Sequence, residues 1–462
     1  MKTQEYIDRR DKLKKNVGSG LLLLPGNNQV PMNYPSNTFP FRQDSSLLYF
    51  TGIDHPGICL LIDCETGEEI LFGVDLTTED LIWTGPQDSL TTIASLSGIN
   101  KTGSYNELSS KIRNNLKSKR AIHYLPPYPS DRKIFLSNMF GKSISEIEEE
   151  ISLPFIQEVI KLRSIKSKSE VEEIEEAINL ATARMHLETL KMADPGRYEF
   201  EIIANICKIA FENNMGLAYP IICSVHGEIL HNEYHGNKLQ HGQILLVDAG
   251  AESNLHYASD ITRTFPVGGK FTSQQKEIYE LVLKTQIDSI NKLKPGVRFI
   301  DIHKSAAINI TKGLIDIGLM KGNAEEAVES GAHALFFPHG LGHMLGLDVH
   351  DMEDLGEKLV GYSKDIQRSP QFGTSHLRLA RILEEGFVVT IEPGVYFIPA
   401  LINQWLIEKK FEEFINFKIL PDYFGFGGVR IEDNLLITAE GNRILGEPIP
   451  KQLSEIEYLY SK

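Results

Sequence analysis

The stretch "QILLVDAGAESNLHYASDITRTF", residues 243–265, predicts a β-hairpin in which each strand carries an aspartate. Apolar and β-branched residues flank a turn at Ser253-Asn254. Asp248 and Asp260 are equally far along the chain from Asn254, so a three-residue loop would place their carboxylates opposite each other, with Cβ atoms about 5 Å apart. Facing carboxylates repel each other unless a cation lies between them. The alternative, two solvated aspartates at a sheet edge, fits Asp248 poorly, because Asp248 lies inside the apolar run "ILLVDAG".

Two glutamates occupy similar positions further along the chain. Glu392 ends the apolar run of "FVVTIEPGVYF", and "GGVRIEDNLLIT" predicts Glu432 inside a strand with Arg430 on the same face. Taken alone, either glutamate is equally well explained as a strand-end carboxylate paired with a nearby Arg or Lys. Taken with the aspartates, they make four carboxylates within or at the ends of apolar strands. A pair of divalent cations would neutralise them.

The run "HGLGHMLGLDVHD", residues 339–351, combines histidines with glycines. We expect His343 to supply a neutral imidazole ligand, while the glycines allow a close approach of the backbone. His350 is predicted to lie beside the metals as a hydrogen-bond donor, and His339 to be structural, because Pro338-His339-Gly340 is typical of a turn. Carboxylates with one imidazole suit hard to borderline metals such as manganese.

Composition excludes several classes of protein. A chain of 462 residues, 42% hydrophobic and 24% charged, has room for two or three globular domains. A formal net charge of −15 argues against nucleic acid and anionic membranes as partners. The four cysteines have no disulfide or zinc-site spacing, and the charged amino terminus does not look like a signal peptide. We therefore expect a cytoplasmic protein.

Alternating strands and helices in the first third predict an α/β domain. The expected strands are 20–26, 58–63, 68–73 and 121–125, and a helix is expected over 105–119. A long amphipathic helix should then begin near Ser169 and end before Pro195-Gly196. Pairs of helices precede acid-bearing strands twice, which suggests a duplication. We place the boundary so that residues 1–165 form one domain and residues 166–462 another.

These motifs resemble the pita-bread metallopeptidases, and within them the proline-specific branch of aminopeptidase P and prolidase. The likeness rests on "VDAGAESNLHYASDITRTFP", "GHMLGLDVHD", "TIEPGVYF" and "GGVRIEDN", and "FRQDSSLLYFTGIDHPG" is similar to the family's non-catalytic first domain. It implies an α/β N-terminal domain followed by an α+β catalytic domain with a curved, mostly antiparallel sheet and pseudo-twofold duplication.

The resemblance also implies roles for individual residues. It implies a set of ligands for two metal ions, with Mn²⁺ the expected metal: Asp248, Asp260, His343, Glu392 and Glu432. Asp260 and Glu432 would be shared by the two ions, and Arg430 would hold a ligand carboxylate. His231 and His350 would contact the substrate, and Glu392 would shuttle a proton to the leaving nitrogen.

The implied activity is hydrolysis of the Xaa-Pro bond at the amino terminus of peptides, by a homo-oligomer, dimeric or tetrameric. The nearest alternative is an Xaa-Pro dipeptidase, and an alternative of another class is a metal-free binding module. Insertions at 352–386 and 400–427 occur in prolidases and in some bacterial aminopeptidases P, so they leave the choice between the two enzymes open. Arg378, in the first insertion, resembles a clamp for the free carboxylate of a dipeptide.

Overall fold

The computed structural model describes residues 1–462 and divides into two compact units. One contains Met1–Arg163 and Met352–Gly356, and the other contains Ser164–Asp351 and Glu357–Lys462. The short return of the chain to the first unit at 352–356 was not predicted. No helix is both long and apolar enough to cross a membrane.

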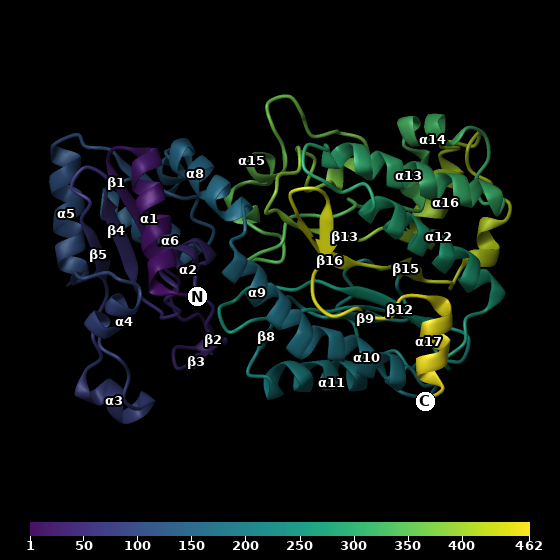
Figure 1. Ribbon diagram of the computed structural model, residues 1–462, viewed down its shortest axis with the longest axis horizontal. Coiled ribbons are helices and arrows are strands. Elements are labelled where there is room, and N and C mark those ends of the chain that lie inside the picture. The colour runs from purple at the N-terminus through teal and green to yellow at the C-terminus, as the bar shows by residue number, and fades with distance from the viewer. The chain divides into compact units, whose positions relative to one another are not determined.

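The N-terminal unit is built on a five-stranded mixed sheet (Figure 1). In sheet order its strands are β6 (Thr102–Gly103), β5 (Glu69–Phe72), β4 (Cys59–Asp63), β1 (Leu21–Pro25) and β7 (Ile122–Tyr124). Strand β1 pairs with β4 antiparallel and with β7 in parallel, as in an α/β domain. Alternate residues of these strands, such as Leu21 and Leu23, pack against Leu108 and Ile112 of α5 to form a core. The predicted strands and helix of this region are confirmed.

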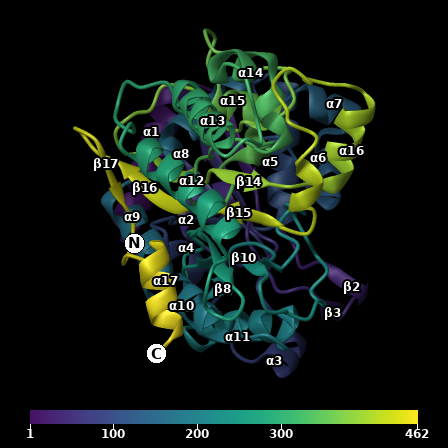
Figure 2. The same ribbon diagram turned by 90° about the vertical axis from the view of Figure 1, so that its right-hand side faces the viewer.

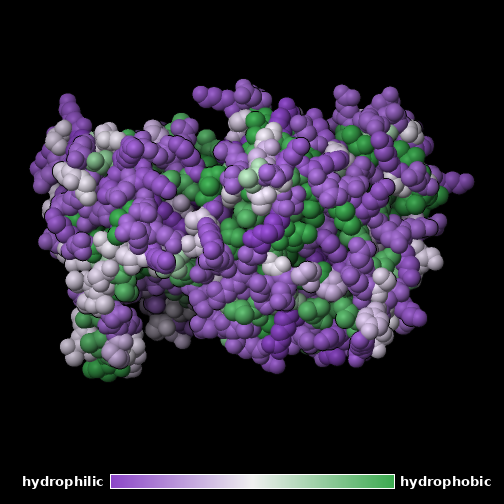
Figure 3. All heavy atoms as spheres, in the orientation of Figure 1, coloured by the Kyte–Doolittle hydropathy of each residue, from purple (hydrophilic) through white to green (hydrophobic).

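Eight helices belong to the first part of the chain. They are α1 (Thr3–Val17), α2 (Ser45–Thr51), α3 (Thr78–Thr84), α4 (Leu90–Leu96), α5 (Tyr105–Lys117), α6 (Ser130–Phe140), α7 (Ile144–Glu149) and α8 (Leu153–Ser164). A hairpin of β2 (Pro31–Tyr34) and β3 (Asn37–Thr38) completes this part. Helix α3 buries none of its residues and leaves Ile82 and Trp83 75% and 82% exposed. Apolar side chains gather on the surface there (Figure 3).

The long helix of the catalytic unit differs from the prediction at its start and in its middle. Ser167, not Ser169, is the N-cap of α9 (Lys168–Ala177), because Ser167 and Glu170 form a capping box. A π-helical segment at Ile178–Thr182 then leads into α10 (Ala183–Met192). The Thr182 hydroxyl in this segment accepts a hydrogen bond from the Ala251 N–H at 3.0 Å.

The other elements of this unit include the predicted pairs of helices and further helices that were not predicted. The helices are α11 (Glu199–Glu212), α12 (Ser273–Ile290), α13 (Phe299–Asp316), α14 (Ala324–Ser330), α15 (Glu357–Gly361), α16 (Pro399–Ile407) and α17 (Leu453–Tyr460). The strands are β8 (Gly216–Leu217), β9 (Ile222–Ser224), β10 (Ile244–Asp248), β11 (Ala251–Glu252), β12 (Thr262–Pro266), β13 (Val388–Ile391), β14 (Gly394–Tyr396), β15 (Gly428–Arg430), β16 (Asp433–Ile437) and β17 (Asn442–Ile444).

Every strand pair in the catalytic unit is antiparallel, in small sheets of two or three strands. Helices α10 and α11 lie on one side of these strands, and α12 and α13 lie on the other (Figures 1 and 2). A helix pair precedes strands in each half, which matches the predicted duplication. This is the α+β pita-bread arrangement expected from the resemblance.

The hairpin forms, but with a different register from the one predicted. Asp248 pairs with Thr262 rather than with Asp260. The loop does have three residues, closed by a 2.9 Å hydrogen bond from the Ser253 N–H to the Tyr257 carbonyl, and its centre is one residue later than expected. His256 takes the left-handed conformation, with φ of 66°, that ends such loops. Asp248 and Asp260 remain on one face as diagonal neighbours.

Candidate metal centre

A cavity of about 1000 Å³ opens in the catalytic unit. It is lined by every residue that the sequence singled out as a site residue: His231, Asp248, Asp260, His343, His350, Arg378, Glu392, Arg430 and Glu432. These residues come from segments that lie up to two hundred positions apart in the chain. The fold therefore brings all the candidate residues into the lining of one cavity.

Strand ends position the four carboxylates. Asp248 is the last residue of β10, Asp260 lies two residues before β12, and Glu392 directly follows β13. Glu432 lies in the short break between β15 and β16, rather than inside a strand as predicted. The backbone departs from strand geometry in this break, and the pairing of β15 with β14 and of β16 with β13 holds the break in place. These four carboxylates thus lie at or just beyond the ends of buried strands.

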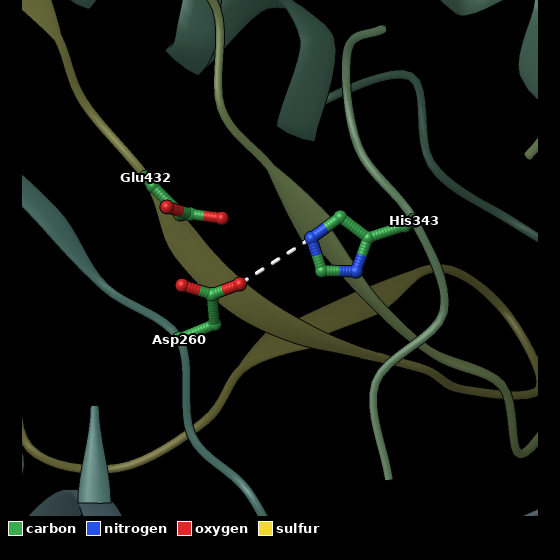
Figure 4. A group of neighbouring side chains, drawn as sticks. All are labelled: Asp260, His343 and Glu432. Atoms are coloured by element: carbon green, nitrogen blue, oxygen red, sulfur yellow. Dashed lines mark ion pairs between the residues drawn. The ribbon is translucent and has the colours of Figure 1, made fainter. Parts of the chain in front are cut away.

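Three of the donors form a compact group. Single ligand atoms of Asp260, His343 and Glu432 all lie within 4.8 Å of one another (Figure 4). The His343 Nε2 atom is 3.3 Å from Asp260 Oδ2 and 3.6 Å from Glu392 Oε1. His343 Nδ1 lies 3.0 Å from the Met344 carbonyl, which can only accept, so Nδ1 carries the proton. Nε2 is then the atom that can offer a lone pair to a metal.

Asp248 is connected to this group through other side chains. Its Oδ2 accepts a hydrogen bond from the Arg430 guanidinium at 2.6 Å, in a buried ion pair. The Tyr219 hydroxyl lies 2.6 Å from Oδ1 of both Asp248 and Asp260. Tyr219 thus connects the two aspartates, and no sequence motif marked it as a site residue.

The carboxylates carry more negative charge than their surroundings neutralise. Burial, followed by the negative charges of Asp260 and Glu392, raises the pKa of Glu432 well above its ordinary value. Burial also raises the pKa of Glu392 to about 7, against the opposing effect of His343. Four carboxylates lie around the Arg430 guanidinium here, so the site favours an added positive charge.

A buried carboxylate oxygen without a hydrogen-bond partner also indicates a cation site. Glu432 Oε2 accepts a hydrogen bond from the Thr262 hydroxyl at 2.6 Å, whereas the buried Oε1 has no hydrogen-bond partner. A buried, unpartnered carboxylate oxygen is costly unless a cation satisfies it. The donor set therefore fits a divalent metal ion held by oxygen and one imidazole nitrogen.

The histidines of the cavity differ in their surroundings. The ring of His350 packs edge-on against the ring of His343, with centroids 4.5 Å apart, and His231 is exposed on the wall. His339 donates through Nδ1 to the Gly340 carbonyl at 2.7 Å and accepts at Nε2 from the Tyr396 hydroxyl at 2.9 Å. The same hydroxyl accepts from Arg430 at 2.9 Å. His339 thus has the structural bonding that was predicted, but it also lines the cavity.

Comparison with known proteins identifies the family. Residues 172–439 match the model of "Metallopeptidase family M24", and residues 6–123 match "Aminopeptidase P, N-terminal domain". The chain belongs to metallopeptidase family M24. As a member of this family it is a metallopeptidase, which agrees with the donor group built by Asp260, His343 and Glu432.

Relatives of this M24 protein cover almost its full length. It is 32% identical to an Xaa-Pro aminopeptidase of Haemophilus influenzae, over 99% of this chain and 97% of that one. It is 30% identical to a human Xaa-Pro dipeptidase, over 97% of this chain and 90% of that one. The solved structure of proline aminopeptidase P II from Yersinia pestis superposes with a TM-score of 0.82 at 27% identity, covering 100% of both chains.

Proposed function

We propose that the protein is an Xaa-Pro aminopeptidase, which removes the first residue from peptides with proline in second position. The observation that carries the proposal is the buried donor group of Asp260, His343 and Glu432, set in a large cavity. The near full-length similarity to the Haemophilus influenzae aminopeptidase supports it. A cavity of about 1000 Å³ is at the upper end of the range for ligand sites and leaves room for a peptide longer than two residues.

The proposed cofactor is a pair of divalent ions, with Mn²⁺ the expected metal. Asp248, Asp260, His343, Glu392 and Glu432 would hold them. When bound, such ions lower the pKa of a water molecule and so supply a nucleophile at neutral pH, as in other two-metal hydrolases. Support comes from the uncompensated carboxylates and the unpartnered oxygen of Glu432.

Side chains around the donors would do the rest of the chemistry. His350 and His231 are proposed to donate hydrogen bonds to the substrate carbonyl and to the oxyanion that develops on it. Glu392, whose Oε1 lies 3.6 Å from His343 Nε2 beside the donor group, can accept a proton and return it to the leaving proline nitrogen. Arg430 holds Asp248 in place through the buried ion pair.

Two measurements test this proposal. Purified protein reconstituted with Mn²⁺ should contain two ions per chain by elemental analysis, and an active preparation without metal would contradict the metal centre. The reconstituted enzyme should release the first residue from an Xaa-Pro-Yaa tripeptide and leave an Xaa-Ala-Yaa control intact. Cleavage of Xaa-Pro dipeptides alone would make the protein a dipeptidase.

The dipeptidase is the second candidate, because Arg378 lines the cavity and the human dipeptidase aligns over most of both chains. A guanidinium binds a free carboxylate through two charge-assisted hydrogen bonds. We expect Arg378→Ala to weaken dipeptide hydrolysis more than tripeptide hydrolysis, by about 1.5–3 kcal/mol in kcat/KM. Equal losses on both substrates would remove Arg378 from the substrate site.

The remaining expectations concern the class of protein, its location and its assembly. A metal-free binding module would need a broken donor set, whereas all five ligand positions hold metal-binding side chains. A cytoplasmic location and a homo-oligomeric state, dimer or tetramer, stay predictions. Light scattering on the purified protein would test the second, and fractionation of cells would test the first.

A further inference from the structure

The turn that carries His343 and His350 is closed by the residue after it, Asp351. The Asp351 N–H donates to the Met344 carbonyl at 3.0 Å, and Asp351 Oδ1 accepts from the Asp348 N–H at 3.3 Å. A Cβ atom on Gly346 would lie 2.5 Å from Asp351 Oδ2, so glycine leaves the space that this carboxylate occupies. Asp351 therefore bonds to the turn from inside it and fixes its shape.

Lys166, two residues before the first residue of α9, pairs with this carboxylate. Its Nζ lies 2.8 Å from Asp351 Oδ2, and both side chains are only 1% exposed. The Lys166 N–H donates to the Gly386 carbonyl at 2.8 Å, just before β13. Strand β13 also holds the other end of the turn, because the His343 N–H and carbonyl bond to Thr390 at 3.1 and 3.0 Å. Lys166 and the turn are thus both hydrogen-bonded to the segment that contains β13.

Stability alone does not account for this ion pair. Burying two charges costs about as much as their attraction returns, so such pairs contribute little net stability, although removing one partner is strongly destabilising. Neither Lys166 nor Asp351 lines the cavity, so neither touches a substrate there. The residue that does line it is His350, one position before Asp351.

We propose that Lys166 is a positioning residue for His350. Through Asp351 it fixes the turn, so that the His350 imidazole stays against the ring of His343 and faces the cavity. The inference rests on the proposed function, in which His350 donates a hydrogen bond in the transition state. Loss of the lysine charge would loosen the turn, misplace His350 and slow turnover without removing the metal ligands.

The first test is Lys166→Met, which keeps the length of the side chain and removes its charge. We expect kcat on an Xaa-Pro-Yaa tripeptide to fall roughly 10- to 100-fold, the range for partners one step removed from a metal centre, with bound Mn²⁺ unchanged. Lys168→Met is the matched control, because the Lys168 side chain is 90% exposed, and it should keep wild-type kcat. Wild-type kcat in Lys166→Met would overturn the proposal.

A double-mutant cycle separates positioning from a general structural effect. If Lys166 acts through His350, Lys166→Met should change kcat by less than about twofold in a His350→Ala background. An undiminished loss in that background would overturn the proposal. If His350→Ala alone keeps full kcat, the role proposed for His350 fails instead, and the two failures are thereby distinguished.

A second variant covers the case in which Lys166→Met does not fold. Lys166→Met combined with Asp351→Asn leaves no lone buried charge, so this pair should be better tolerated. It should still show a loss of kcat that disappears in the His350→Ala background. Wild-type kcat in the folded double variant would contradict the proposal.

Discussion

At the residue scale, Tyr219 is the least expected member of the site. A phenol has one proton to donate, yet its oxygen lies 2.6 Å from two carboxylates, so one of these contacts needs a proton from the acid itself. Burial, ahead of the opposing charge of Arg430 and the charge of Asp260, raises the pKa of Asp248. A bound cation would take the place of this proton.

Removing the hydroxyl should therefore weaken metal binding while leaving the ligands present. We expect Tyr219→Phe to lower Mn²⁺ affinity roughly 10- to 100-fold, as for other residues that orient metal ligands. Isothermal titration of the metal-free protein measures it. Tyr458→Phe, at an exposed position, is the control and should bind Mn²⁺ like the wild type. Unchanged affinity in Tyr219→Phe would show that the hydroxyl does not orient the aspartates.

Asp260 and His350 should fail in different ways. Asp260 lies in the compact donor group, so Asp260→Ala should abolish metal binding and activity together. His350 is proposed to act on the transition state, so His350→Ala should keep both metals and lose turnover, mainly in kcat. Metal content and steady-state kinetics of each variant decide this. Loss of both metals from His350→Ala would make it a ligand.

At the element scale, the loop before His343 packs against the strand β13 without room for a side chain. A Cβ atom on Gly342 would lie 2.0 Å from the Thr390 carbonyl oxygen. We expect Gly342→Ala to push the loop off β13, which lowers the free energy of unfolding by about 1–3 kcal/mol and displaces His343 from the donor group.

Denaturant unfolding and metal titration of the same variant test both effects. Gly441→Ala is the matched control, because a Cβ there meets no atom within 4 Å. It should change the free energy of unfolding by less than about 0.5 kcal/mol. A Gly342→Ala protein with wild-type metal affinity would mean that His343 does not depend on this contact.

At the scale of the whole molecule, buried histidines make stability depend on pH. Burial lowers the pKa of His186 and His303 to about 3 and that of His333 to about 4. Both ring nitrogens of His303 and of His333 lack hydrogen-bond partners, so the folded state holds these rings neutral. The unfolded chain binds protons near pH 6.5, so stability is full above that pH and falls as the pH drops below it.

When the pH falls from 6.5 to 5, each of these histidines should lower the free energy of unfolding by about 2 kcal/mol. His303→Phe keeps an aromatic ring beside Phe337 and should reduce the slope of stability against pH by about one proton. Unfolding curves at several pH values compare this variant with the wild type. An unaltered slope in His303→Phe would mean that this ring is protonated in the fold.

Local sequence patterns were enough to predict the class of the fold and the residues that line the cavity. The informative features are local patterns: acidic residues at the ends of apolar runs, glycines around a histidine, and helix pairs before strands. Such patterns can be recognised from turn residues and from hydrophobic periodicities of 3.6 and two residues. Tertiary structure alone decided which atoms meet. The strand partner of Asp248 is Thr262, two residues beyond the predicted Asp260, because packing and the left-handed conformation of His256 set the hairpin register. Tyr219 bonds to aspartates 29 and 41 residues away, and Lys166 pairs with a residue 185 away. No local pattern encodes such contacts, because they depend on how strands from distant segments pack around one cavity.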